Sequence, residues 1–310
     1  MNRLELPFGR AICYSGFRNG QSPETGIFPS YEEIKEDLLL LQGHWEYLRL
    51  YDCDPHAETV LDVLETEDLN FRAMLGVYIV AEVSNHNCEW GGVYSDEQLA
   101  SNIIQNQNNV RKLIRLANRY PQIIFSLSAG NEAAVEWTDH LVPVERIMGY
   151  VKWIKDGTHQ PVTFCDNYAP WLDKLEPLVD LVDFISIHTY PVWEYKGIED
   201  GLTFTQDNFN AVADKYPHKS VIITEAGWAT NSNGRGIEPH NVSEELQRTY
   251  YKQLVNWSDE QGVLTFIFEA FDEEWKGSPE PLEPEKHWGL FRTDRKPKLV
   301  MQELFSQLLD

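Results

Sequence analysis

Basic residues, cysteines and long apolar runs are all scarce in this chain of 310 residues. Lysine and arginine number 26 against 49 aspartates and glutamates, which gives a formal net charge of −23. Such a charge repels nucleic acid and anionic membrane surfaces, because phosphate binding requires clustered cations. It also disfavours a polyanionic polysaccharide. We therefore expect a neutral partner, with neither nucleic acid nor membrane involved.

The chain has only four cysteines, which lie far apart and form no CxxC pair: Cys13, Cys53, Cys88 and Cys165. This spacing favours buried free thiols over a disulfide framework. Possible metal ligands crowd one short segment, namely Asp52, Cys53, Asp54 and His56. Their spacing is not that of a zinc site, so we expect no metal and no other cofactor.

No stretch is long and apolar enough to span a membrane, and the first residues, MNRLELPFGR, contain no apolar signal-peptide core. We therefore favour a cytoplasmic protein, or a periplasmic or secreted one if an export signal was removed. The composition is otherwise that of an ordinary globular protein, with 42% hydrophobic and 24% charged residues. We expect a monomer.

Short apolar segments alternate with amphipathic segments along the whole chain. The predicted strands are 11–17, 47–53, 75–83, 123–132, 162–168, 184–192, 221–225 and 263–271. Predicted helices include 59–64, 144–156, 172–181, 204–216, 244–259 and a closing amphipathic helix at 299–309. Ser30, three residues before Glu33, has the spacing of a capping box, and Ser95 can cap a further long helix. Eight strands alternating with helices, without a break in composition, predict one (β/α)8 TIM barrel over residues 1–310.

Two of the predicted strands end in a glutamate. The segment VIITEAGW places Glu225 directly after apolar residues, and IIFSLSAGNE ends in Asn131 and Glu132. The carboxyl ends of the strands form the catalytic face of such a barrel. Burying a carboxylate there costs free energy, so such a residue is expected either to take part in catalysis or to pair with a cation. A rim ion pair explains one such acid equally well. Two acids on the fourth and seventh strands oppose each other, which suits glycoside hydrolysis by an acid and a second carboxylate, with Asn131 placed to bind the sugar 2-hydroxyl.

Six segments carry a resemblance to a known family: ICYSG with Tyr14, LRLYD with Arg49 and Tyr51, SAGNE, ITEAGW, FEAFDEEWK and EKHWGLF. Together they resemble glycoside hydrolase family 17, the β-1,3-glucanases, over essentially the whole chain. The resemblance implies that Glu132 is the acid/base and Glu225 the nucleophile of a retaining enzyme. It also matches three charged residues of that family to Glu273, Lys276 and Glu285.

The chain departs from the plant members of this family at several positions. Ala226 and Ala229 stand where those members have Thr and Pro, and His188 precedes Tyr190 where they carry Asn. The overall pattern is closer to bacterial members. These changes retain both glutamates, but they leave open the layout of the sugar subsites and the choice between internal and chain-end cleavage.

Several neighbouring residues have both a functional and a structural interpretation. Arg49 favours the ionised form of Glu225, or is simply a core-edge ion pair. His188 and Tyr190 orient the nucleophile, or His188 is a satisfied rim histidine. The three matched charged residues position Glu132 or the sugar, or form a structural salt bridge.

Aromatic rings beside strand ends are candidates for stacking on a sugar or for core packing: Trp90, Trp193, Trp228, Trp275 and Trp288. The predicted substrate-binding set is Tyr14, Arg49, Tyr51, Asn131, His188, Tyr190, Trp228, Glu273, Lys276, Glu285 and Trp288.

The leading functional hypothesis is a retaining hydrolase of laminarin-like β-1,3-glucan that forms a covalent glucosyl intermediate on Glu225. A glucanosyltransferase would use the same two glutamates and pass the glucosyl unit to another glucan. A non-catalytic glucan-binding barrel, or the same chemistry on another neutral glycan, are further alternatives.

Overall fold

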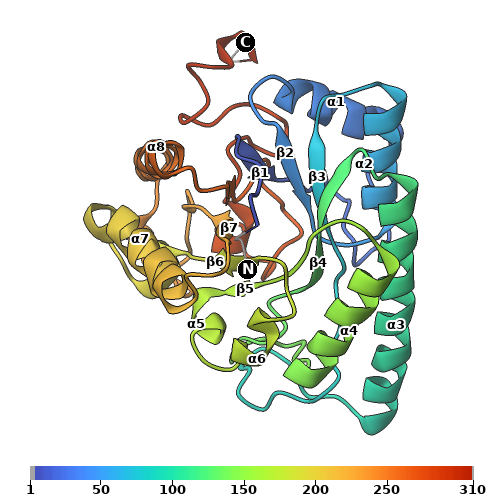
Figure 1. The fold of residues 1–310 in the computed structure, drawn as a ribbon. Coiled ribbons are helices and arrows are strands. Elements are labelled where there is room, and N and C mark those ends of the chain that lie inside the picture. The colour runs from blue at the N-terminus through green and yellow to red at the C-terminus, as the bar shows by residue number, and fades with distance from the viewer. Residues whose placement is uncertain (1–3, 309–310) are drawn as a thin grey trace.

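The computed structural model describes residues 4–308, which form a closed barrel of parallel strands inside a ring of helices (Figure 1). The strands are β1 (Ala11–Cys13), β2 (Tyr47–Leu50), β3 (Arg72–Gly76), β4 (Ile124–Asn131), β5 (Val162–Asn167), β6 (Ile185–His188), β7 (Val221–Ala226) and β8 (Thr265–Ile267). Each strand pairs with the next in chain order, and β8 closes the barrel on β1. The predicted (β/α)8 fold is confirmed.

The outer layer consists of α1 (Tyr31–Leu41), α2 (Pro55–Thr66), α3 (Asp96–Arg119), α4 (Val144–Gly157), α5 (Tyr168–Trp171), α6 (Glu176–Val179), α7 (Ile198–Lys215) and α8 (Glu244–Gln261). Short 3-10 turns lie at Pro191–Glu194, Pro239–Asn241, Pro284–Lys286 and Ser306–Leu308. Ser30 caps α1 in a complete capping box with Glu33, and Ser95 caps α3, as the sequence predicts. No helix within residues 4–308 is long and apolar enough to cross a membrane.

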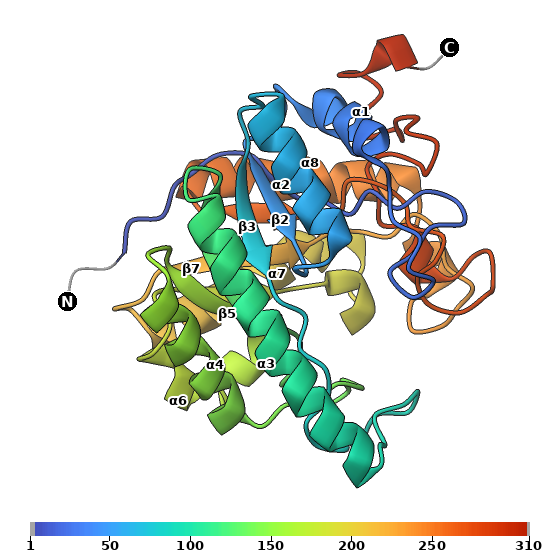
Figure 2. The same ribbon diagram turned by 90° about the vertical axis from the view of Figure 1, so that its right-hand side faces the viewer.

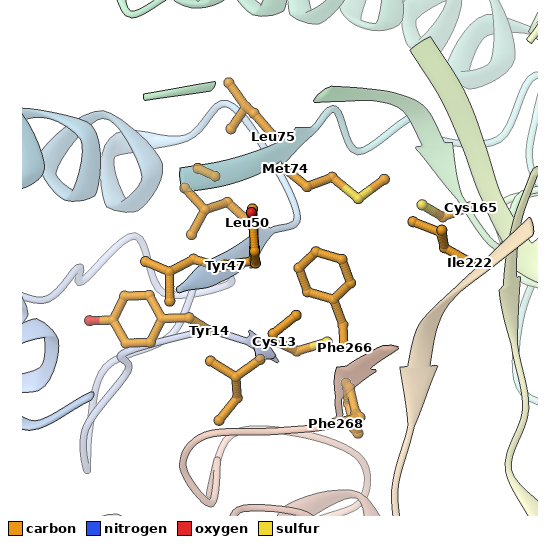
Figure 3. Close-up of a cluster of buried hydrophobic side chains, with 14 of the residues drawn as sticks. Cys13, Tyr14, Tyr47, Leu50, Met74, Leu75, Cys165, Ile222, Phe266 and Phe268 are labelled. Atoms are coloured by element: carbon orange, nitrogen blue, oxygen red, sulfur yellow. The ribbon is translucent and has the colours of Figure 1, made fainter. Parts of the chain in front are cut away.

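Side chains from opposite walls fill the space between the strands (Figure 3). Those that meet there include Cys13, Met74, Cys165, Ile222 and Phe266, each at most 2% exposed. All four cysteines are buried and unpaired, as their spacing predicts. The barrel is therefore a packed core and not a channel, and any reaction must take place at its rim.

Some predicted elements differ from the structure. Strand β3 ends at Gly76. Val77 N still bonds to the Ser128 carbonyl of β4, but beyond it Tyr78 N donates to Asp52 and Val80 N to Asn106. The helix predicted over 172–181 is interrupted, since Pro177 cannot lie inside a helix and instead occupies the first turn of α6.

The closing helix predicted over 299–309 is wrong for the residues that the structure describes; residue 309 lies outside them. The segment forms turns followed by the short turn Ser306–Leu308. Its apolar residues pack individually, with Phe305 against Trp45 and Phe291, while Leu299 N donates to Glu244 of α8. Apolar residues at helical spacing can therefore also belong to an irregular segment whose side chains are buried one by one, and the sequence does not distinguish the two cases.

Candidate active site

The two strand-end glutamates meet at the mouth of the barrel. Glu225 lies on β7 and is 4% exposed, whereas the side chain of Glu132, directly after β4, is 30% exposed. One carboxylate oxygen of each and an imidazole nitrogen of His188 lie within 4.8 Å of one another. Glu132 has a φ of 46°, a left-handed conformation that is uncommon outside glycine and clusters at functional sites.

The surroundings of Glu225 favour its ionised form. Arg49 of β2 donates to Glu225 Oε1 and, over 3.0 Å, to the carbonyl of Thr224; Tyr190 donates to Glu225 Oε2. Burial alone would raise the pKa of Glu225, but the charges of His188 and Arg49 and these hydrogen bonds hold it below the ordinary carboxyl value. An ionised carboxylate is what a nucleophile requires.

His188 lies between the two acids. Its Nδ1 donates to Glu132 Oε1 over 2.8 Å and is 3.5 Å from Glu225 Oε2. Burial alone would lower the pKa of His188, but the charge of Glu225 and hydrogen bonds to Cys165 and Glu132 raise it to about 10. The sequence associated His188 with the nucleophile, whereas its shorter contact is to Glu132. That contact uses Oε1 and leaves Oε2 of Glu132 for a substrate oxygen.

Arg49 also ties the fourth strand to this network. Its guanidinium donates to Asn131 Oδ1, donates to the Tyr51 hydroxyl over 3.3 Å and lies 4.4 Å from the Tyr51 ring centroid. On the other side, His140 Nε2 bonds to the Asn131 carbonyl over 2.9 Å. Sequence reasoning missed His140, because it belongs to no motif and reaches Asn131 only through the fold of the β4–α4 loop.

A second charged group lies on the segment after β8. Lys276 Nζ is 2.7 Å from Glu269 Oε2 and also pairs with Glu273, which accepts hydrogen bonds from Ser15 and from Trp275. Burial is the main cause of a strongly raised pKa at Glu269, whereas Lys276 lowers the pKa of Glu273 despite its burial. The pKa values of these two carboxyl groups are therefore shifted in opposite directions. The sequence contained Glu269 within a matched motif but gave no sign of its role.

Glu285 connects this group to the reacting pair. Burial raises the pKa of Glu285 to about 7; the charge of Lys276 opposes that rise, and those of Glu132 and Glu283 add to it. Glu273 pairs directly with Lys276, and Glu285 interacts electrostatically with both Lys276 and Glu132.

Two residues of the predicted substrate-binding set lie away from the mouth. Tyr14 is 1% exposed and its hydroxyl donates to Asp37 of α1 over 3.1 Å, because it follows the inward-facing Cys13 and so points outward. Trp228 is also 1% exposed, with its ring on Tyr250 of α8. Neither ring is available to a sugar, so the structure corrects the expectation that these two residues bind substrate.

The other candidate tryptophans differ in how much of each ring is exposed to solvent. Trp288 is 1% exposed and packs behind Tyr190, with ring centroids 5.0 Å apart, so it supports that residue and offers no stacking face. This corrects its predicted sugar contact. Trp193 and Trp275 are partly exposed, and Trp90 is 60% exposed.

The crowded segment after β2 has local structural roles. Asp54 caps α2, Asp52 accepts hydrogen bonds from the amides of Cys53 and Tyr78, and His56 Nε2 accepts from Gly16 N. Within residues 4–308 the group compact enough for a metal is instead Glu132, His188 and Glu225. The guanidinium that pairs with Glu225 opposes a cation there, and the donor set fits two-carboxylate chemistry better.

Two opposed strand-end carboxyl groups at the mouth of a (β/α)8 barrel define a glycoside hydrolase. A family model described as the BtgE/BtgC glycoside hydrolase domain matches residues 11–289. The chain belongs to this family.

Similar proteins agree with this membership. A glucan 1,3-beta-glucosidase of Arthroderma benhamiae is 25% identical over 91% of this chain and 88% of its own length. A putative glucan endo-1,3-beta-glucosidase of Aspergillus niger is 24% identical over 87% of this chain but only 40% of its own length. The crystal structure of an endo-laminarinase from Formosa Hel1_33_131 has a TM-score of 0.79 and 26% identity, covering 96% of this chain and 86% of that one.

A family 17 β-1,3-glucanosyltransferase from Rhizomucor miehei shares the fold, with a TM-score of 0.71 and 20% identity over 94% of this chain and 95% of that one. The relationship to family 17 that the motifs predicted is confirmed.

Proposed function

We propose that the protein is a retaining β-1,3-glucan hydrolase with Glu225 as nucleophile and Glu132 as acid/base. The observation that carries this proposal is the approach of their carboxyl oxygens to within 4.8 Å. Retaining glycosidases hold the two carboxyl groups about 5–5.5 Å apart, whereas inverting enzymes need about 6.5–9.5 Å to admit a water molecule.

The reaction proceeds in two steps, formation of a glucosyl ester and its hydrolysis. Glu132 gives its proton to the glycosidic oxygen as Glu225 attacks C1, so the C1–O bond breaks, the leaving chain departs as an alcohol and a glucosyl ester forms. Glu132, now a carboxylate, then takes a proton from water, whose oxygen attacks C1 and releases Glu225. Arg49 and Tyr190 hold the two oxygens of Glu225 in place before the attack.

Two observations support β-1,3-glucan as the substrate. The relatives from Arthroderma and Aspergillus are named as 1,3-beta-glucosidases, and the structural neighbour from Formosa as an endo-laminarinase. The formal net charge of −23 also suits a neutral polysaccharide.

Transfer to a second glucan is the alternative outcome of the same intermediate. It is favoured by the shared fold of the Rhizomucor miehei glucanosyltransferase. An acceptor hydroxyl replaces water in the second step and gives its proton to Glu132.

Incubation with defined laminari-oligosaccharides tests the proposal. We expect shorter products, with the β-anomer appearing first when the reaction is followed by proton NMR, because two displacements at C1 retain configuration. Initial release of the α-anomer would contradict the assigned mechanism. Products longer than the starting oligosaccharide would identify transfer.

Substitution of Glu285 tests the electrostatic interaction between this residue and Glu132. The charges of Glu285 and Glu132 repel each other, so removal of the Glu285 charge removes this repulsion. Glu285→Gln is therefore expected to move the basic limb of the kcat/KM–pH profile toward lower pH, by up to about one pH unit. The exposed Glu280 on the same segment supplies the matched control, Glu280→Gln. Superimposable profiles for Glu285→Gln and the parent enzyme would show that this coupling is absent.

A further inference from the structure

Helix α3 extends beyond its neighbours α2 and α4 on one side of the barrel mouth (Figure 2). Helix α3 has 24 residues against 14 in α4, and at about 1.5 Å per residue the difference amounts to about 15 Å. Figure 2 shows the N-terminal end of α3 extending beyond the neighbouring helices, with the β3–α3 loop at that end. This loop, residues 77–95, therefore stands beside the mouth on the side of β3 and β4.

The β3–α3 loop is tied to the β4–α4 loop, residues 132–143. Asn85 is 5% exposed, and its amide nitrogen donates to the carbonyls of Glu136 (2.8 Å) and Thr138 (2.7 Å). The Tyr94 hydroxyl donates to the Asp139 carbonyl over 2.9 Å. Buried side-chain bonds of this kind fix one loop against the other, so we treat the pair as one surface, the joined loops.

The joined loops are anchored beside the acid/base. His140 bonds to the Asn131 carbonyl, and its Nδ1 is 3.2 Å from the Tyr78 hydroxyl, with the two rings 4.9 Å apart. His140 thus links the Tyr78 ring to the backbone of the residue directly before Glu132. Tyr78 therefore belongs to the part of the joined loops that is tied to the end of β4.

Large rings on the joined loops are open to solvent. The exposed fractions are 37% for Tyr78, 43% for Trp137 and 60% for Trp90. Trp137 lies between the two residues whose carbonyls accept from Asn85, and Trp90 adjoins Gly91, which faces Asp139 across the loop junction. Exposed aromatic rings on a rigid support are typical of a surface that binds the apolar face of a partner.

The roles of Glu132 and Glu225 determine which part of the glucan can reach the exposed rings of the joined loops. Glu132 must contact the glycosidic oxygen that joins the attacked glucosyl unit to the leaving chain, while Glu225 must lie at C1. The leaving chain therefore departs on the side of Glu132. After cleavage the same space is open to water or to an acceptor sugar.

We propose that the joined loops bind the glucan beyond the scissile bond, with Tyr78 beside its first glucosyl unit and Trp137 and Trp90 stacking on later units. This inference rests on the proposed function and adds to it the surface that selects the leaving chain. Because an acceptor occupies the same surface, the joined loops also set the ratio of transfer to hydrolysis.

The test compares two substrates in Trp137→Ala and Trp90→Ala. Laminarihexaose can occupy the joined loops, whereas a 4-nitrophenyl β-laminaribioside cleaved at its aryl bond places no glucosyl unit there. The ratio of kcat/KM on the first substrate to that on the second is expected to fall about tenfold in Trp137→Ala, through loss of one stacking contact. With laminaribiose in excess as acceptor, the proportion of lengthened products is expected to fall as well.

Phe8→Ala is the matched control, because Phe8 is 46% exposed and precedes β1, at the opposite end of the barrel. The inference is overturned if both tryptophan variants keep the parental ratio, or if Phe8→Ala changes it equally. Either result leaves the proposed function intact as long as the parent enzyme hydrolyses laminarin. A folded parent enzyme without activity on either substrate would contradict the proposed function itself.

Discussion

Replacing Glu225 by alanine is expected to lower kcat on laminarin by about 10⁴-fold or more, because the glucosyl ester can no longer form. Added azide is expected to restore turnover of an activated aryl substrate. The anion enters the space left by the carboxylate and forms a C1–N bond on the face opposite the one from which the aryl oxygen departs. The product is then an α-glucosyl azide, identified by NMR. Circular dichroism checks that the variant is folded.

Glu132→Ala is the complementary variant. It retains the nucleophile, so the glucosyl ester still forms from an activated aryl substrate, while hydrolysis of laminarin falls by about 10²–10⁴-fold. Azide then attacks the ester from the opposite face and gives a β-glucosyl azide. If the two variants yield azides of the reverse configuration, the roles of Glu132 and Glu225 are exchanged. Substantial laminarin hydrolysis by Glu225→Ala would remove the covalent mechanism altogether.

The architecture could be predicted because its causes are local. Apolar runs mark strands covered on both sides, and cap residues such as Ser30 and Ser95 mark where helices begin. The two glutamates could be placed because the end of a parallel strand fixes which rim of the barrel a residue occupies. Their approach across the mouth then follows from closure of the barrel.

The orientation of neighbouring side chains could not be predicted in the same way. Tyr14 and Trp228 adjoin strand ends, but a shift of one residue turns a side chain from the interior to the surrounding helices. His140 and Asn85 act through contacts between loops that no spacing in the chain records. Resemblance supplies the identity of motif residues, whereas the fold alone shows the direction in which each one points.

The charges in direct contact with the reacting acids are positive, in contrast to the net negative charge of the whole chain. The chain carries a net charge of −23, yet Arg49 and His188 contact the reacting acids directly. The charges of His188 and Arg49 hold the pKa of Glu225 below the ordinary carboxyl value despite its burial. Arg49 donates a hydrogen bond directly to the Glu225 carboxylate. Substitution of Arg49 is therefore the sharpest test of how the site keeps the pKa of its nucleophile low.

Arg49→Ala is expected to move the acid limb of kcat/KM to higher pH by about one to three pH units. The nucleophile must be ionised, and its pKa rises when the guanidinium is removed, so less of it is ionised at a given acidic pH. Arg49→Lys keeps a charge without the planar set of donors and is expected to shift the limb less. An acid limb that stays in place in Arg49→Ala would show that another group governs it.

The same substitution has a consequence for stability, with a defined sign. In the parent protein the lowered pKa of Glu225 stabilises the fold above the unfolded carboxyl pKa of about 4.3, and this contribution is lost as the pH falls through the folded value. In Arg49→Ala the buried carboxylate loses its guanidinium partner and keeps only His188 and Tyr190, which is expected to cost up to about 3–5 kcal/mol at pH 7. Protonation of Glu225 removes that penalty, so urea unfolding at pH 7 and pH 4 should show the difference from the parent shrinking at the lower pH. A difference of equal size at both values would mean that Arg49 stabilises the barrel by packing and not by its charge.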